Sequence, residues 1–176
     1  MSYFVRKISH SRYYKIVRSE NIHDVEADVV SNDLRTTKNC LSTWKINDPN
    51  EVDNAILAIA STSDHIEKMA FLLLDESHLI DNELEIEDER DEGCPVADMA
   101  SAHANIANLS YRKIGTVLGV VKNIPDAEII TRTKPQIFSL INDAKNCGRL
   151  DVLKLKEDVM KYISPQDYSR IYGTED

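Results

Sequence analysis

The chain has 176 residues, of which 42% are hydrophobic and 29% are charged, with only five glycines and five prolines. This composition excludes a disordered or fibrous chain and predicts one helix-rich domain with a core of its own. No apolar run approaches the roughly 20 residues that span a bilayer, so we expect no contact with a membrane.

The three cysteines, Cys40, Cys94 and Cys147, are odd in number and far apart. Such spacing is typical of free thiols in a reducing compartment rather than of a disulfide framework. The N-terminal residues also lack the apolar core of a signal peptide. We therefore expect a cytoplasmic location.

The net charge of −9 is unevenly distributed along the chain. Residues 1–18 carry five bases and no acid, whereas residues 75–92 carry ten acids and one base. An acidic surface disfavours non-specific binding of nucleic acid, because that binding depends on neutralising phosphates. Nucleic acid would therefore have to bind at the basic N-terminus, with Arg6, Arg12, Lys15 and Arg18 meeting phosphates and nearby tyrosines stacking on bases. The alternative is that these bases only solvate a surface.

The N-terminal half combines strand and helix patterns. Residues 3–8 and 13–18 are aromatic and β-branched, which predicts two strands joined by a turn at His10-Ser11. Valines at helical spacing predict a short helix within residues 24–34. Residues 41–46 alternate apolar and polar side chains, as a half-buried strand does.

A helix and a buried strand follow. Asp48 or Asn50 can cap a helix that runs to about Ala60. Residues 69–74 are continuously apolar, which is typical of a strand buried on both faces. The order of strand, helix and strand fits either a crossover unit or an antiparallel sheet.

The second half reads as mainly helical. Residues 96–124 form one long helical pattern, with His103 on its apolar face as a core histidine. Gly115 and Gly119 lie one turn apart, and each costs about 1 kcal/mol against alanine in a helix interior. That cost favours the close approach of another backbone at this face, so we expect the two glycines to belong to a binding surface.

The C-terminal segment predicts a short strand and a helical hairpin. Residues 128–131 suit a strand, and Thr133 can cap a helix that ends near Asn146. Asp151 can cap a further helix. The chain therefore predicts an α+β fold, with a small mixed sheet in the N-terminal half packed on the long helix. We divide it into a core of residues 1–124 with an acidic loop at 75–93, and a hairpin of residues 125–176 packed on the same domain.

The segment around Asp75-Glu76 resembles the Walker B strand of nucleic-acid helicases, where a carboxylate at a strand end holds Mg²⁺. Such chemistry needs a glycine-rich phosphate loop with its lysine, and no such motif is present. The alternative is that the two acids cap whatever follows the strand. The five histidines and three cysteines show no metal-ligand spacing, so we expect neither a metal nor a cofactor. A metal-dependent hydrolase would need His65 and His78 to approach Asp75.

Three short motifs, in chain order, resemble those of the mono-ADP-ribosyltransferase family. They are Arg6 or Arg12 on an early strand, Ser42-Thr43 on a later strand, and a Glu-x-Glu pair at Glu83-x-Glu85 or Glu85-x-Glu87. The resemblance implies a base on the phosphates of a nicotinamide dinucleotide, a hydroxyl that orients the arginine, and a carboxylate that stabilises an oxocarbenium ion. The alternative is that an acid-rich run contains Glu-x-Glu by composition alone. If the chain is an enzyme, the candidates are Arg6, Ser42, Asp75, Glu76, Glu85 and Glu87.

Residues 39–44 and 108–115 resemble segments of small bacterial proteins from mobile elements and defence islands, a likeness that implies no activity. The separation of charge and the paired glycines favour a protein partner or a homo-oligomer. The first hypothesis from the sequence is therefore a non-catalytic interaction protein, a small subunit or regulator of a larger bacterial assembly. An enzyme on a nucleotide or nucleic-acid substrate, and a nucleic-acid-binding module, are the alternatives.

Overall fold

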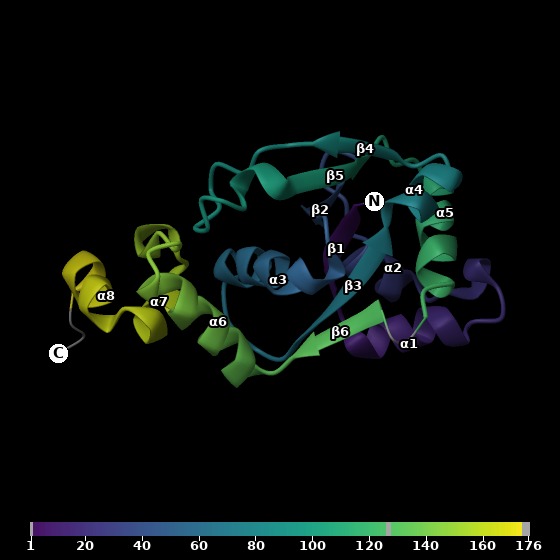
Figure 1. Ribbon diagram of the computed structural model, residues 1–176. Coiled ribbons are helices and arrows are strands. Elements are labelled where there is room, and N and C mark those ends of the chain that lie inside the picture. Colours follow the sequence, from purple (N-terminus) through teal and green to yellow (C-terminus); the bar gives the residue numbers. More distant parts are fainter. Residues whose placement is uncertain (1, 126–127, 174–176) are drawn as a thin grey trace.

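A six-stranded sheet forms the centre of the computed structural model, which describes residues 2–125 and 128–173 (Figure 1). The strands are β1 (Tyr3–Ile8), β2 (Leu41–Ile46), β3 (Met69–Asp75), β4 (Glu85–Asp88), β5 (His103–Ala107) and β6 (Ile129–Arg132). They lie in the order β4-β5-β2-β1-β3-β6, and every ladder between them is antiparallel. The α+β class is confirmed, although the sheet is antiparallel rather than mixed and takes β6 from the segment after residue 125.

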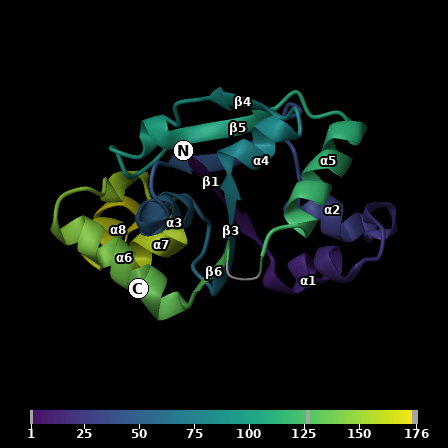
Figure 2. The ribbon, with the colours of Figure 1, turned by 45° about the vertical axis from the view of Figure 1, so that its right-hand side comes forward.

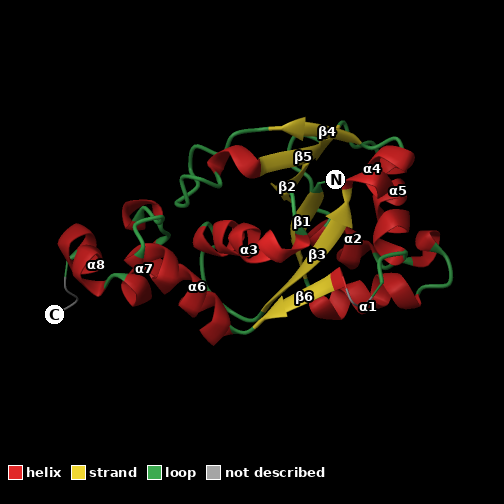
Figure 3. Ribbon diagram, viewed as in Figure 1, coloured by secondary structure: helices red, strands yellow, loops and turns green. Residues whose placement is uncertain are grey.

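Helices cover both faces of the sheet (Figure 2), and Figure 3 separates them from the strands by colour. One face carries α3 (Val52–Ser61), α6 (Lys134–Asn146), α7 (Glu157–Ile163) and α8 (Pro165–Tyr172). The other face carries α1 (His10–Arg18), α2 (Ala27–Asp33), α4 (Glu76–Asp81) and α5 (Tyr111–Lys122). The predicted hairpin joined a helix starting at Thr133 to one capped by Asp151. The structure has α6 and α7 in these places, but Asp151 caps a single 3-10 turn, Val152–Lys154, before α7 begins, and α8 follows as a further short helix.

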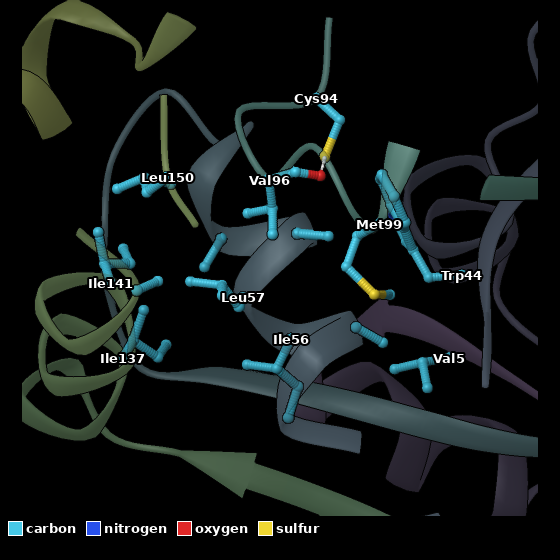
Figure 4. Close-up of a cluster of buried hydrophobic side chains, with 14 of the residues drawn as sticks. Val5, Trp44, Ile56, Leu57, Cys94, Val96, Met99, Ile137, Ile141 and Leu150 are labelled. Atoms are coloured by element: carbon cyan, nitrogen blue, oxygen red, sulfur yellow. Dashed lines mark hydrogen bonds between the residues drawn. The ribbon is translucent and has the colours of Figure 1, made fainter. Parts of the chain in front are cut away.

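Strand β3 contributes to two hydrophobic clusters, one on each face of the sheet. Phe71 packs in the cluster that includes Trp44 from β2 and Ile56 from α3 (Figure 4), whereas Leu72 packs in the cluster with α1 and α5. Alternate residues of a strand point to opposite faces, so a central strand covered on both sides must be apolar at every position. The continuous apolar run at the start of β3 is therefore a consequence of its central place.

Two predicted elements are wrong. Residues 13–18 belong to helix α1 and not to a strand, because Tyr13 and Ile16 are three residues apart and both fully buried on one helix face. Residues 96–124 are not one helix. Ala104 and Ile106 alternate into the core as strand β5, and Ser110 then begins α5 by accepting a hydrogen bond from the Lys113 amide.

The acidic segment is structured, which corrects the prediction of a loop. Asp75 ends β3 and caps α4, and Glu85–Asp88 form the edge strand β4 beside β5. Charged side chains on an edge strand oppose pairing with the edge of another sheet. The position of β4 at the edge of the sheet therefore explains its acidic residues without a binding partner.

Candidate functional site

Strands β1 and β2 separate halfway along their length. Tyr3–Val5 pair with Trp44–Ile46, but the rest of β1 pairs only with β3 and the rest of β2 only with β5. Arg6 spans the gap: its Nη1 donates to the carbonyl of Ser42 at 2.7 Å, and its Nη2 donates to the carbonyl of Asp33 at 3.0 Å. The guanidinium thus ties β1 to β2 and to the end of α2.

A groove with a volume of about 680 Å³ opens beside this split. Its acids come from β4 and the residue after it, and its bases come from β1 and from the chain between α2 and β2. They are Glu87, Asp88 and Glu89 on the one hand, and Arg6, Arg35 and Lys38 on the other. Among residues 2–125 and 128–173, no ion pair neutralises Arg35, Lys38, Glu87 or Asp88. The groove therefore offers charges of both signs to a ligand.

Neighbouring strands place polar side chains in register along the groove. Ser42 of β2 lies opposite Asn105 of β5, and Asn105 lies opposite Glu87 of β4. His103 precedes Asn105 by two residues and so lies on the same face of the sheet. The side-chain amide of Asn105 donates to the carboxylate of Glu89 and holds it beside this row.

Ser42 and His103 form a hydrogen bond within the row. The distance from Ser42 Oγ to His103 Nε2 is 2.8 Å, and His103 Nδ1 lies 2.9 Å from the carbonyl oxygen of Glu89. A carbonyl oxygen only accepts hydrogen bonds, so Nδ1 carries the proton and Nε2 of the neutral ring is left as an acceptor. The Ser42 hydroxyl therefore donates to His103.

The charges behind the groove are buried. Burial lowers the pKa of Arg6 to about 10, although nearby Asp33 opposes that change. Burial also raises the pKa of Asp33, against the hydrogen bonds from the Ser9 amide and Arg12 and the charge of Arg6. Arg6 Nε and one carboxylate oxygen of Asp33 have no hydrogen-bond partner among residues 2–125 and 128–173. Burying polar atoms without partners costs free energy, so Arg6 and Asp33 lower the stability of the fold while they connect β1 to α2.

The structure brings together some of the predicted enzyme residues and separates others. Arg6, Ser42 and Glu87 line the same groove. Asp75 instead accepts hydrogen bonds from the amide and hydroxyl of Ser77, which together with nearby charges hold its pKa below the usual value despite partial burial. Glu76 lies near Lys45 at the opposite end of β1.

Glu85 is also outside the groove. Its carboxylate accepts hydrogen bonds from Lys113 and Asn108, each at 2.6 Å, and these lower its pKa. Of the two possible Glu-x-Glu pairs, therefore, only the glutamate at position 87 shares a groove with Arg6 and Ser42. The structure also departs from the family motifs at the serine. The resemblance implies that the serine hydroxyl orients the arginine, whereas Arg6 here donates to the Ser42 carbonyl.

Apart from Arg6, the basic residues of the predicted N-terminal surface lie on α1 and make contacts within the protein. Arg12 pairs with Asp33 at 3.2 Å, and Lys15 pairs with Glu26 at 2.6 Å. Arg18 lies over the ring of Tyr14. The predicted β-hairpin would have carried these bases on one strand face, free to bind a ligand. In the structure they lie on a helix and make contacts within the protein instead.

Gly115 and Gly119 line a different groove, on α5. Apart from the adjacent residues and backbone of α5 itself, nothing in the described chain lies within 4 Å of a Cβ placed at either glycine. No backbone of the described chain therefore makes the close approach that the two glycines predict. His78 also lines this groove, whereas His65 lies beside α6 and α7, and no cluster of three potential metal ligands occurs within the described residues.

The sequence did not indicate Arg35 and Lys38 as groove residues, nor did it indicate His103, Asn105 and Glu89. Because residues 96–124 were interpreted as one helix, His103 was expected in a core. On a helix, residues two apart do not share a face, so the alternating polar pair of His103 and Asn105 did not indicate a surface. That alternation, next to the buried Ala104 and Ile106, is the pattern of a half-buried strand. It was the available signal for a polar face on β5.

Comparison with known proteins gives no match of any kind, whether to family models, to curated proteins or to solved structures. Across residues 2–125 and 128–173, no helix combines the length and apolar character that crossing a membrane requires.

Proposed function

We propose that the protein is an enzyme that acts on a nicotinamide dinucleotide in the groove beside the β1–β2 split, with chemistry like that of the mono-ADP-ribosyltransferases. The observation that carries the proposal is the meeting of Arg6, Ser42 and Glu87 in one groove, although they come from three strands and are as much as 81 positions apart. Such a set fits the order of the family motifs. Convergence in one cleft is what the chemistry requires of these groups.

The charges of the groove suit the two ends of such a substrate. Arg35 and Lys38 form no ion pair with any residue that the structure describes and can bind a pyrophosphate, with the edge of the Arg6 guanidinium behind them. Glu87, which is likewise unpaired within the described part of the chain, can stabilise the positive charge that develops on the ribose as its bond to nicotinamide breaks. The acceptor would enter the groove from solvent.

The test uses chromatography to measure the rate at which the purified chain releases nicotinamide from the dinucleotide. We expect Glu87→Gln to lower the rate by about 10²–10³-fold, as the loss of one electrostatic stabiliser of a transition state does. Glu85→Gln is the matched control, because that glutamate lies two residues away on β4 but binds Lys113 outside the groove. We expect it to keep the rate of the unaltered chain.

Absence of nicotinamide release by the unaltered chain overturns this function. Equal losses in both glutamine variants would instead indicate that β4 itself is damaged, and far-ultraviolet circular dichroism distinguishes that case. Binding of the dinucleotide by Glu87→Gln, measured by calorimetry, separates a loss of chemistry from a loss of affinity.

A second candidate function is the non-catalytic one, a small subunit or regulator of a larger bacterial assembly, with a role in defence or mobile elements. Exposed apolar side chains near the C-terminal end favour it: Tyr162 is 68% exposed, and Leu153, Ile171 and Tyr172 are about half exposed. Light scattering of the purified chain and copurification from the native host test it. A monomer that recovers no partner argues against this role. The free cysteines support a cytoplasmic location for either function.

A further inference from the structure

Ser42 and His103 have an arrangement that the motif resemblance does not include. The serine is exposed to the groove, and its hydroxyl donates to a histidine whose other nitrogen is held by a main-chain carbonyl. A nucleophile, a base within hydrogen-bond reach and a third group that orients the base are the three parts of an activated hydroxyl. All three are present here, and each is joined to the next by a hydrogen bond shorter than 3 Å.

The orientation of the imidazole is fixed by several contacts. The Glu89 carbonyl sets the tautomer, and the ring packs edge-on against Trp44, with 5.2 Å between ring centres. The amide of Glu89 also bonds to the carbonyl of His103, so both residues are locked in the β5 ladder. Nε2 therefore has one direction available, which is toward Ser42 and the groove.

We propose that His103 is the general base of the groove and that it acts through the Ser42 hydroxyl. When an electrophile is bound, the Ser42 proton passes to His103 Nε2, and Oγ either attacks the electrophile or takes a proton from an acceptor hydroxyl that does so. The carboxylate of Glu89, which the Asn105 amide holds, lines the same groove as the resulting imidazolium. Proton transfer by a positioned base contributes about 10²–10⁴-fold to a rate.

In the dinucleotide reaction, which rests on the proposed function, the proton balance is simple. The bond from the ribose carbon to nicotinamide breaks, and nicotinamide leaves as a neutral molecule. The acceptor oxygen bonds to the ribose carbon, its proton moves to Ser42 Oγ, and the Ser42 proton moves to His103. No oxidant or reductant is needed.

The first test does not depend on the dinucleotide. A fluorophosphonate probe is added to the full chain: Ser42 Oγ bonds to phosphorus, fluoride leaves, and His103 receives the proton. Peptide mass spectrometry locates the adduct. We expect labelling at Ser42, with a rate that falls by about 10²–10⁴-fold in His103→Gln. Glutamine can keep a hydrogen bond to the serine but cannot take its proton.

His65→Gln is the control, because His65 lies beside α6 and α7, away from the groove. A rate unchanged in this variant and lost in His103→Gln supports the pair. No labelling of Ser42 in the unaltered chain, or equal labelling in His103→Gln, shows that the hydrogen bond is only structural and overturns the proposal. Thermal melting of each variant, and recovery of labelling in His103→Ala on adding imidazole, separate loss of the base from loss of the fold.

The pH profile gives a readout that a structural role would not move. Labelling of the unaltered chain should rise with pH, because only an unprotonated base can accept the Ser42 proton, and this rise should vanish in His103→Gln. Other charged groups line the same groove, and the unaltered chain and His103→Gln both keep them; they are Arg6, Arg35, Lys38, Glu87, Asp88 and Glu89. A rise that persists in His103→Gln assigns the profile to one of these and contradicts the proposal.

A second test uses the dinucleotide with two acceptors. Water must lose a proton as it attacks, whereas azide anion has none to lose. We expect His103→Gln to slow the reaction when water is the acceptor. The rate at which azide captures the ribose carbon should be the same in this variant as in the unaltered chain. Equal slowing with both acceptors contradicts a base. If the unaltered chain releases no nicotinamide, the proposed function fails, while the labelling experiment still decides whether Ser42 and His103 form a proton-transfer pair.

Discussion

Arg6 replaces main-chain hydrogen bonds at the point where β1 and β2 part. Its two Nη groups satisfy carbonyls of Ser42 and Asp33 that a continuous ladder or a longer helix would otherwise satisfy. A planar guanidinium can make both bonds at once because its donors form a rigid fork. The residue that implies anion binding in the sequence is thus also a structural tie, and only part of it faces the groove.

The three cysteines differ in their burial, and this difference can be measured. Cys94 is 1% exposed, and burial raises its pKa from 9.0 to about 11. Cys147 is exposed. The thiolate is the reactive form, so at pH 8 we expect iodoacetamide to modify Cys147 promptly and Cys94 only after unfolding. Peptide mass spectrometry with and without denaturant checks this. Prompt modification of Cys94 in the folded chain would contradict its burial.

The same thiol predicts the direction of a pH effect on stability. The folded chain holds the Cys94 proton more tightly than the unfolded chain does, so its contribution is complete below about pH 9 and is lost as pH rises toward 11. A Cys94→Ala variant should therefore show a shallower fall in melting temperature over that range.

Residue types alone could indicate Arg6, Ser42 and Glu87 but not their partners. The first three were found because the family motifs give an order of residue types along the chain. His103 was placed on the wrong element, and a residue whose element is wrong cannot be assigned to a site. Glu89 enters through its main-chain carbonyl as well as its side chain, which no side-chain motif can indicate.

At the scale of elements, local chemistry predicted those segments whose signals are self-contained. The strands of residues 3–8, 41–46 and 69–74 follow from composition and alternation, and α6 follows from the cap at Thr133. Residues 13–18 failed because tertiary contact of Tyr13 and Ile16 overrides their strand preference. Residues 96–124 failed because a short strand next to a helix can imitate a helical period.

The capping box of α6 is the clearest element-level feature to test. The Thr133 amide donates to the side chain of Gln136 at 2.8 Å, and the Gln136 amide donates back to the Thr133 hydroxyl. Thr133→Ala removes this acceptor, and we expect a loss of about 0.5–2 kcal/mol in the free energy of unfolding. Urea denaturation measures the loss. Thr116→Ala is a control, because that exposed hydroxyl only bonds back within α5. Equal losses in the two variants would refute the importance of the cap.

At the scale of the whole molecule, the sheet joins two clusters into one structure. Phe71 and Leu72 are adjacent in β3 but point into opposite clusters, and both are at most 1% exposed. We expect Phe71→Ala to cost about 3–5 kcal/mol and Leu72→Ala about 2–5 kcal/mol. Because β3 is common to both clusters, each variant should shift one and the same unfolding transition to lower temperature.

Calorimetry checks this cooperativity. Tyr111 is 96% exposed, so Tyr111→Ala should change the melting temperature little. Two separate transitions in either core variant would show that the helices on the two faces unfold independently. The combination of sheet and helices was predictable in class from the sequence, but the three layers were not, because strand order depends on pairings between distant segments.

The division of the sheet at β1 and β2 has a mechanical consequence. Beyond Val5 the molecule holds two smaller sheets, β4-β5-β2 and β1-β3-β6, that share a short common seam. On the open side of this seam, Arg6 joins the two parts through its hydrogen bonds to the carbonyls of Ser42 and Asp33. A ligand anion that binds this guanidinium in the groove must compete with the carbonyl of Ser42 for its hydrogen bond, so we expect filling of the groove to weaken the link between the two smaller sheets.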